Sequence, residues 1–178
     1  MKIPTKLLSG MITLFSLLSL GCGGGVSEAF APTQEGVAFV NQEKFEAAIE
    51  RFDHALTLDP KFVPALIDRG YTYDKLGDFE RAIEDYNEAI RLEPENAKAY
   101  NNRGFAYRNL GQYQLALADY EEAIRLNQLY ADGYANRALV NAFLGNDTQV
   151  DEDFDRAVEL GFDPDELKAE LDNARKQR

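Results

Sequence analysis

The chain has 178 residues, of which 45% are apolar and 28% are charged, so it is long enough for one domain with its own core. Its formal net charge of -12 excludes nucleic acid and anionic lipid surfaces as charge-complementary partners of the folded part, because both are polyanions. With one cysteine, Cys22, and one histidine, His54, the sequence offers no intramolecular disulfide, nucleophile–base pair or metal cluster. We therefore expect no enzyme, no cofactor and no metal site, and an acid-dependent hydrolase is the remote alternative.

The segment 1–21 is predicted to be a signal peptide. Lys2 and Lys6 precede an uncharged run from Leu7 to Leu20, and this order of charged and apolar residues is typical of secretion signals. As a helix, the run would span roughly 21 Å, which is less than the thickness of about 30 Å of a bilayer core. The run therefore does not predict a membrane-spanning helix.

The end of the apolar run, Leu18-Ser19-Leu20-Gly21-Cys22, resembles the lipobox of bacterial lipoproteins, although Ser19 stands where a leucine is usual. The resemblance implies cleavage before Cys22, lipidation of that residue (with palmitate, for example) and a flexible tether over residues 22–31. Two acyl chains on one cysteine are enough for stable anchoring. We expect a protein of the bacterial cell envelope that is anchored to a membrane by lipid. The alternative is a conventional signal peptide cleaved near Gly21, which would give a secreted or periplasmic soluble protein.

The rest of the chain is a tandem repeat, and one period is the stretch of sequence from Arg69 to Arg103. The segments RGYTYDKLGDFERAIEDYNEAIRL, from Arg69, and RGFAYRNLGQYQLALADYEEAIRL, from Arg103, are near copies of each other. Small and aromatic residues recur at the same offset through four repeats, in the columns Gly36, Gly70, Gly104, Ala138 and Phe52, Tyr86, Tyr120, Phe154. The predicted units are residues 29–62, 63–96, 97–130 and 131–164, which make up a repeat domain over 32–162.

Each repeat is predicted to form two antiparallel helices. Leu66, Gly70 and Tyr73 lie at positions i, i+4 and i+7, which share one face of a helix. Gly77 and Gly111 follow such helices and can adopt the left-handed conformation that ends them. The column of small residues lets the two helices approach closely, and the aromatic column fills the space beside it. Since one hairpin cannot bury its own apolar face, neighbouring hairpins must stack to complete the core.

This pattern resembles the tetratricopeptide repeat (TPR) family, in which aromatic, glycine, tyrosine, alanine and proline positions recur with the same period. The second repeat shows the match at Leu66, Gly70, Tyr73, Ala82, Tyr86 and Pro94. The resemblance implies an all-α fold, a right-handed superhelical solenoid of four helix hairpins. It also implies a non-catalytic interaction module that binds an extended peptide or helix of a protein client in a concave groove. The alternative is a self-associating structural protein of the cell envelope, a homo-oligomer without a separate client.

Residues 163–178 are predicted to form a capping helix. Asp163 is suited to the N-cap, Pro164 to the first turn and Glu166 to a capping box. An apolar stripe follows, made of Leu167, Leu171 and Ala174. An autoinhibitory helix that folds into the groove is the alternative.

Two charged columns predict an ion pair within every repeat. The first column reads Glu35, Arg69, Arg103, Arg137, and the second, at a constant separation further along the chain, reads Arg51, Asp85, Asp119, Asp153. The two positions of each pair have opposite charges and lie roughly opposite each other in an antiparallel hairpin. Because a half-buried charge needs a partner, we interpret these residues as structural and not as ligand-binding.

The groove itself is predicted to be lined by side chains of the first helices that lie off the packing face. The candidate partner-binding residues are Asp68, Tyr71, Lys98, Asn101, Asn102, Phe105, Asn109 and Asn136. A column of amides can hold a peptide backbone, since each amide offers one acceptor and two donors, and Tyr71 and Phe105 can supply apolar contacts. For any single residue, a solvated surface is the alternative.

Family members that bind chaperones hold a C-terminal carboxylate with two lysines, two asparagines and an arginine. The corresponding positions here are Thr33, Val37, Asp68, Lys98 and Asn102, which is one match in five. The resemblance therefore does not extend to recognition of chaperone tails. The acids and bases predicted for the groove balance, so we expect no preference for a strongly basic peptide.

Overall fold

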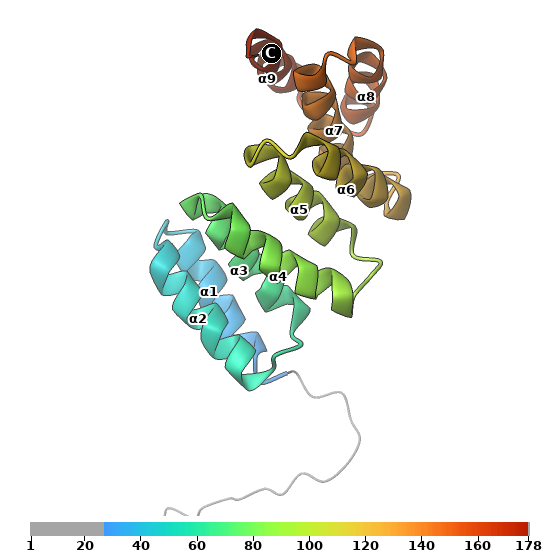
Figure 1. The fold of residues 1–178 in the computed structure, drawn as a ribbon. Coiled ribbons are helices and arrows are strands. Elements are labelled where there is room, and N and C mark those ends of the chain that lie inside the picture. Colours follow the sequence, from blue (N-terminus) through green and yellow to red (C-terminus); the bar gives the residue numbers. More distant parts are fainter. Residues whose placement is uncertain (1–26, 178) are drawn as a thin grey trace, which may run out of the picture.

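The computed structural model describes residues 27–177, so the predicted signal peptide and the lipidation site at Cys22 lie outside the described residues. The described part is all-helical. Its helices are α1 (Phe30–Val40), α2 (Phe45–Leu58), α3 (Val63–Leu76), α4 (Phe79–Leu92), α5 (Ala97–Asn109), α6 (Tyr113–Leu126), α7 (Ala131–Leu144), α8 (Asp147–Glu159) and α9 (Pro164–Lys176). Consecutive helices pack as pairs, and the pairs stack into a curved solenoid (Figure 1). This architecture confirms the predicted all-α fold.

Left-handed residues end the first helix of each hairpin. Gly77, after α3, and Gly145, after α7, have φ angles of 77° and 80°, which glycine adopts without steric cost. The first repeat has Glu43 at the equivalent position, where it adopts a φ of 58° without the help of a glycine. The turn is therefore set by the repeat architecture and not by glycine alone.

The column of small residues packs directly against the aromatic column. A Cβ atom added to Gly70 would lie 2.7 Å from Cε1 of Tyr86, and one added to Gly104 would lie 2.7 Å from Cε1 of Tyr120. Both tyrosines are fully buried, so their rings cannot move aside. The two helices of a hairpin approach each other closely because these positions lack a side chain, as the repeat pattern predicted.

The last helix, α9, covers the end of the array. Asp163 caps it, since its Oδ1 accepts hydrogen bonds from the backbone N–H groups of Asp165 (2.9 Å) and Glu166 (3.0 Å). Leu167 and Leu171 are buried in a cluster with residues of α7, as the apolar stripe predicted. Across the junctions between repeats, α3, α5 and α7 pack chiefly on the second helix of the preceding repeat, whereas α9 packs chiefly on α7, the first helix of its neighbour.

The folded part begins earlier than the sequence analysis predicted. Ala29 is fully buried, α1 starts at Phe30, and the Ser27 hydroxyl donates a hydrogen bond of 3.1 Å to Asp59. The predicted tether over residues 22–31 was therefore wrong at its C-terminal end, because Ser27 and Ala29 contact the first repeat and α1 begins at Phe30. None of the helices between residues 27 and 177 is long and apolar enough to cross a membrane.

Candidate functional site

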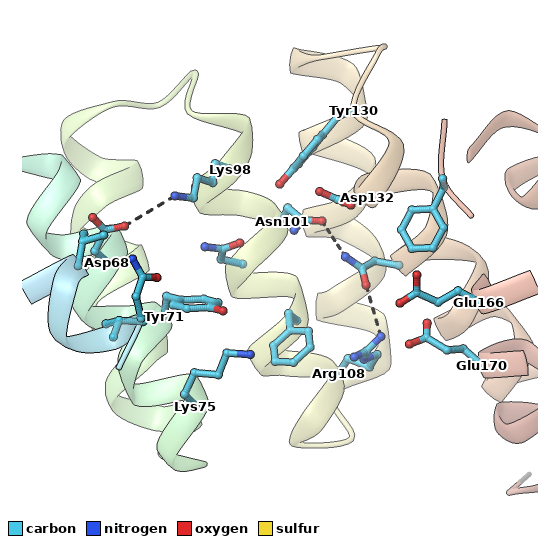
Figure 2. A pocket seen from close by; sticks show the side chains of 17 residues that line it. Asp68, Tyr71, Lys75, Lys98, Asn101, Arg108, Tyr130, Asp132, Glu166 and Glu170 are labelled. Atoms are coloured by element: carbon cyan, nitrogen blue, oxygen red, sulfur yellow. Dashed lines mark hydrogen bonds and ion pairs between the residues drawn. The ribbon is translucent and has the colours of Figure 1, made fainter. Parts of the chain in front are cut away.

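A groove of about 820 Å³ runs along the first helices of the repeats (Figure 2). It begins at α1, with Val37 and Val40, continues over α3, α5 and α7, and ends at α9, with Glu166 and Glu170. The first helices α1, α3, α5 and α7 lie next to one another in the stack, so their outward side chains form one continuous surface. Both ends of the array therefore contribute to the same site.

Seven of the eight predicted partner-binding residues line this groove, namely Asp68, Tyr71, Lys98, Asn101, Asn102, Phe105 and Asn136. Asn109 does not line it: the Asn109 side chain is exposed and donates a hydrogen bond of 2.8 Å to the backbone oxygen of Phe105. Asn109 instead lines a separate, shallower space beside α9. Arg108 and Glu170 line both spaces and so mark the boundary that excludes Asn109 from the groove.

The contribution of α9 to the groove was not predicted from the sequence. Phe162, Glu166 and Glu170 line its C-terminal end, and the two glutamates shift the expected balance of charge. The main groove is lined by four carboxylates and three cations, Asp68, Asp132, Glu166 and Glu170 against Lys75, Lys98 and Arg108, and a further carboxylate, Asp74, lies in the small cavity within the groove. The available signal was the spacing of the two glutamates, which lie one helical turn apart beside the apolar stripe of α9.

Hydrogen bonds fix the polar side chains of the groove across neighbouring helices. The Asn136 amide nitrogen on α7 donates to Asn101 Oδ1 on α5 at 3.1 Å, and Arg108 Nη1 donates to Asn136 Oδ1 at 3.4 Å. Lys98 Nζ lies 3.7 Å from Asp68 Oδ1 (Figure 2). Burial raises the pKa of Asp68, and the charge of Lys98 opposes this shift. The amides are thus held in set orientations before any ligand arrives.

A second, smaller cavity of about 170 Å³ lies within the groove between α3 and α5. Asp74 lines it, and Asp74 Oδ2 accepts a hydrogen bond of 2.7 Å from the Tyr86 hydroxyl. Burial raises the pKa of Asp74 to about 7, although the hydrogen bond from Tyr86 and the charge of Lys75 lower it. Asp74 Oδ1 and Asn102 Nδ2 are buried and have no hydrogen-bond partner among the described residues. This cavity therefore offers unsatisfied polar atoms.

Two aromatic rings form the apolar part of the same cavity. Lys75 Nζ lies 5.0 Å from the ring centroid of Tyr71, and the guanidinium carbon of Arg108 lies 4.8 Å from that of Phe105. Cations over ring faces stabilise such arrangements. Across residues 27–177, no group of three or more His, Cys, Asp or Glu side chains is placed to hold a metal ion. The site combines amides, charges and rings, which bind ligands by hydrogen bonds and ring contacts.

Away from the groove, the arginine column forms the predicted ion pairs. The structure contains Glu35–Arg51 (3.6 Å), Arg69–Asp85 (2.6 Å), Arg103–Asp119 (2.7 Å) and Arg137–Asp153 (2.7 Å). The last three arginines each donate two hydrogen bonds to an aspartate whose side chain is 4–7% exposed. The Glu35–Arg51 pair differs, because its side chains are 61% and 39% exposed.

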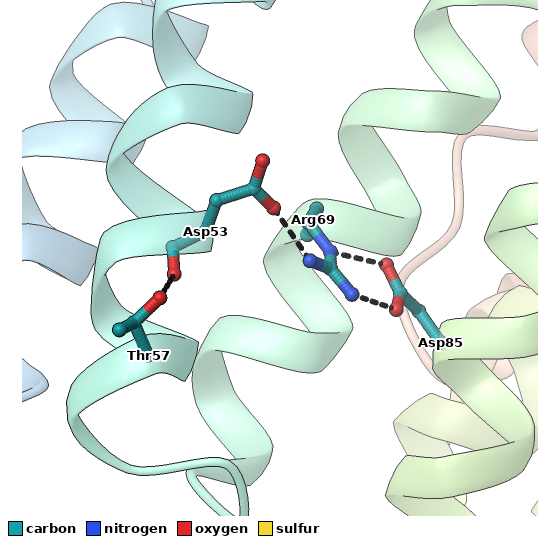
Figure 3. Close-up of polar contacts among 4 residues, drawn as sticks. All are labelled: Asp53, Thr57, Arg69 and Asp85. Carbon is teal, nitrogen blue, oxygen red and sulfur yellow. Dashed lines mark hydrogen bonds and ion pairs between the residues drawn. The ribbon is translucent and has the colours of Figure 1, made fainter.

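Two of these arginines also bridge neighbouring repeats. Arg69 Nη1 pairs with Asp53 of the preceding repeat while its other nitrogens hold Asp85 (Figure 3). Arg103 likewise donates to Asn87 of the preceding repeat at 2.7 Å. The pKa of Arg69 is raised chiefly by its hydrogen bonds to Asp85. This side-chain link across the junctions between repeats was not predicted from the sequence.

Stacked helical hairpins with a groove along their first helices define a repeat solenoid of the kind built around an extended binding surface. A model described as TPR repeat matches residues 70–111. Models described as tetratricopeptide repeat match residues 33–62, 52–84 and 97–128. The chain belongs to the TPR family. A search of curated proteins gave no match.

Solved structures of several TPR proteins resemble this fold. A thermophilic TPR protein of Thermus thermophilus is 26% identical with a TM-score of 0.72, over 84% of this chain and 82% of that one. The first TPR of Spaghetti (RPAP3), bound to the HSP90 peptide SRMEEVD, is 25% identical with a TM-score of 0.64, over 66% and 94% of the two chains. The second TPR domain of human RPAP3, in complex with the HSP70 peptide SGPTIEEVD, is 26% identical with a TM-score of 0.61, over 64% and 93%.

Proposed function

We propose that this chain is a non-catalytic adaptor that binds an extended segment of a partner protein in its groove. The continuous groove from α1 to α9 is the observation that carries the proposal. Its amides are already oriented by hydrogen bonds, which lowers the entropy that binding must cost. The RPAP3 domains bound to HSP90 and HSP70 peptides support a peptide as the class of ligand.

The groove favours a client of mixed polarity over an acidic chaperone tail. Thr33 and Val37 occupy positions where chaperone-binding members have a lysine and an asparagine. Carboxylates outnumber cations in this groove, and like charges across an interface oppose binding. A peptide such as SRMEEVD would bring further acidic groups to this surface. We therefore expect a near-neutral segment with polar side chains.

Site-specific photo-cross-linking tests the location of the client. Tyr71 lies in the groove and Leu115 lies on α6 outside it, and the two are similarly exposed, at 41% and 50%. With benzoylphenylalanine placed at one position or the other, we expect a cross-linked client from position 71 and none from position 115. Equal cross-linking from both positions would contradict the proposal. Cross-links from position 71 to a second copy of this chain alone would favour a self-associating structural protein.

We also propose that the adaptor is anchored to a membrane of the bacterial envelope by lipid on Cys22. The supporting observation is the lipobox-like segment that ends at Cys22. Cys22 precedes Ser27, which donates a hydrogen bond to Asp59 of the first repeat, and the short stretch of chain between Cys22 and Ser27 can span at most about 17 Å. The groove would then operate close to the membrane surface.

Metabolic labelling with a palmitate analogue tests the anchor. We expect label on the wild-type chain, recovery in the membrane fraction, and loss of both in the Cys22→Ser variant. A soluble, unlabelled wild-type chain would show that the signal is cleaved conventionally. Cys22→Ser changes no residue between 27 and 177, so the variant should keep the fold. Loss of the label then reports on the cysteine and not on misfolding.

A further inference from the structure

The small cavity between α3 and α5 is the part of the groove where buried polar atoms lack hydrogen-bond partners. We call it the Asp74 cavity, and it is lined by Tyr71, Asp74, Lys75, Asn101, Asn102 and Phe105. Most buried polar atoms in proteins are paired. Here one acceptor, Asp74 Oδ1, and one donor, Asn102 Nδ2, are both buried without a partner among residues 27–177.

Both side chains line the same cavity and lie beside the hydroxyl group of Tyr86. Tyr86 donates its hydroxyl hydrogen to Asp74 Oδ2 at 2.7 Å. The Asn102 amide is near enough to the same hydroxyl to lower the pKa of Tyr86, but Nδ2 donates no hydrogen bond of acceptable geometry. Asp74 and Asn102 therefore lie beside a common neighbour, and a ligand can reach both only with a donor and an acceptor close together.

We propose that the Asp74 cavity binds the side-chain carboxamide of an asparagine or glutamine in the client. The ligand amide nitrogen donates to Asp74 Oδ1, and its carbonyl oxygen accepts from Asn102 Nδ2. This inference rests on the proposed function of the groove as a peptide-binding site. The planar amide lies between the rings of Tyr71 and Phe105, which line the same cavity.

Other groups satisfy these two atoms less completely. An ammonium or guanidinium has no acceptor for Asn102 and would lie near the cation Lys75. A carboxylate has no donor for the ionised form of Asp74. A main-chain amide has both, but its N–H and C=O point in opposite directions because the peptide bond is trans. A primary carboxamide has its donor and acceptor on the same edge.

The exposed side of the cavity gives the ligand access. The Tyr71 ring is 41% exposed, and exposed side chains change rotamer within nanoseconds. A turn of the Tyr71 side chain would widen the opening of the cavity that Asp74 and Asn102 line, while Phe105 is more buried and stays in place. The cavity thus has one movable wall and one fixed wall.

Labelled pools of short peptides test the inference with the full chain. Each pool has one fixed residue (Gln, Asn, Glu, Lys or Leu) among randomised positions, and affinity is measured by fluorescence anisotropy at about pH 8.5, where ordinary carboxyl groups are ionised. This pH also exceeds the value of about 7 to which burial raises the pKa of Asp74. We expect the Gln and Asn pools to bind about tenfold more tightly than the others.

The Asp74→Asn variant should reverse this preference. In this variant the Tyr86 hydroxyl continues to donate to the side-chain carbonyl oxygen at position 74. The side-chain amide nitrogen at position 74 then faces the cavity beside Asn102 Nδ2. Two donors match a carboxylate, and we expect the Glu pool to become the tightest binder by about tenfold. The control is Asp155→Asn, which removes the same charge from an exposed position on α8 outside the groove. This control should keep the Gln preference.

Each other outcome has a distinct meaning. Equal binding of all wild-type pools would overturn the carboxamide site and leave peptide binding intact. Tightest binding of the Lys pool would overturn it by showing that Asp74 acts as a counter-ion. An Asp74→Asn chain that still prefers the Gln pool would also count against the carboxamide site, provided that circular dichroism shows this chain to be folded. Failure of every pool to bind would contradict the proposed function itself.

Discussion

A hydrogen bond of 2.7 Å from Tyr86 to Asp74 connects a fully buried ring of the aromatic column to the groove. One repeat later, the equivalent positions hold Tyr120 and Arg108. The Tyr120 hydroxyl is buried and has no hydrogen-bond partner in the described part of the chain. Burial raises the pKa of both phenols. One position of the repeat thus has two different polar environments, which allows a matched comparison.

Removing the two hydroxyl groups should have different effects. Tyr86→Phe leaves Asp74 without its donor, so we expect the free energy of unfolding to fall by about 1–2 kcal/mol. Tyr120→Phe removes a hydroxyl that has no partner, and the loss should be below about 0.5 kcal/mol, or stability should rise. Urea denaturation of both variants measures this difference. Equal losses would contradict the unequal roles of the hydroxyl groups.

The buried ion pairs should matter far more than the exposed one. Arg103→Met leaves Asp119, whose side chain is 7% exposed, as a buried charge without its partner, and we expect a loss of about 3 kcal/mol. Arg51→Met breaks the exposed pair with Glu35 and should cost less than about 1 kcal/mol. Denaturation midpoints of the two variants check the contrast. Similar losses would show that burial does not decide the strength of these pairs.

Asp74 should make stability depend on pH. Burial raises its pKa to about 7 in the folded chain, against about 4 for an unfolded aspartate. Between these values the folded state keeps a proton that the unfolded state has released, so stability falls as pH rises through this window. The pKa values of Asp68, Asp85 and Asp119 are raised as well, so the wild-type slope has several contributors.

Substitution isolates the contribution of Asp74 to that slope. In Asp74→Asn the decline in stability between about pH 4 and pH 7 should be shallower than in the wild type. Asp155→Asn, on an exposed part of α8, should decline in parallel with the wild type. Thermal unfolding across this pH range provides the measurement. A wild-type slope in the Asp74→Asn chain would mean that Asp74 titrates as an ordinary surface group.

The capping helix should stabilise the last repeat. Leu167→Ala removes a fully buried side chain from the cluster shared with α7, and we expect a loss of about 3 kcal/mol. Lys168→Ala, at an exposed neighbouring position, should change stability little. Hydrogen exchange should show the faster opening of Leu167→Ala in α7, α8 and α9, while α1 to α3 remain protected. Uniform loss of protection would indicate one cooperative unit.

The parts of the structure that repeat could be predicted from the sequence. Gly70 and Tyr86 recur at a fixed offset, and their contact follows from the geometry of any such hairpin. The ion pairs were predictable because the sign of the charge changes at both positions together, as in Glu35–Arg51 and Arg69–Asp85. Helical spacing also predicted most residues of the groove.

The parts that do not repeat could not be predicted in the same way. The contact of α9 with α7 is more extensive than the contacts between the first helices of earlier repeats, so nothing in the period placed Glu170 in the groove or separated Asn109 from it. The column of Asp74 reads Val40, Asp74, Arg108 and Ala142. These four residues share no chemical property, so the column does not indicate a common role. The cavity itself depends on contacts among three different helices.

The groove includes residues of both the first and the last helix, and this arrangement has a mechanical consequence. Neighbouring units of a solenoid touch only each other, so the whole array can stretch and twist like a spring. A client that lies along the full groove touches α1 and α9 at once and shortens the range of that motion. Pulling the two ends apart would then break contacts with the client at one end of the groove or the other.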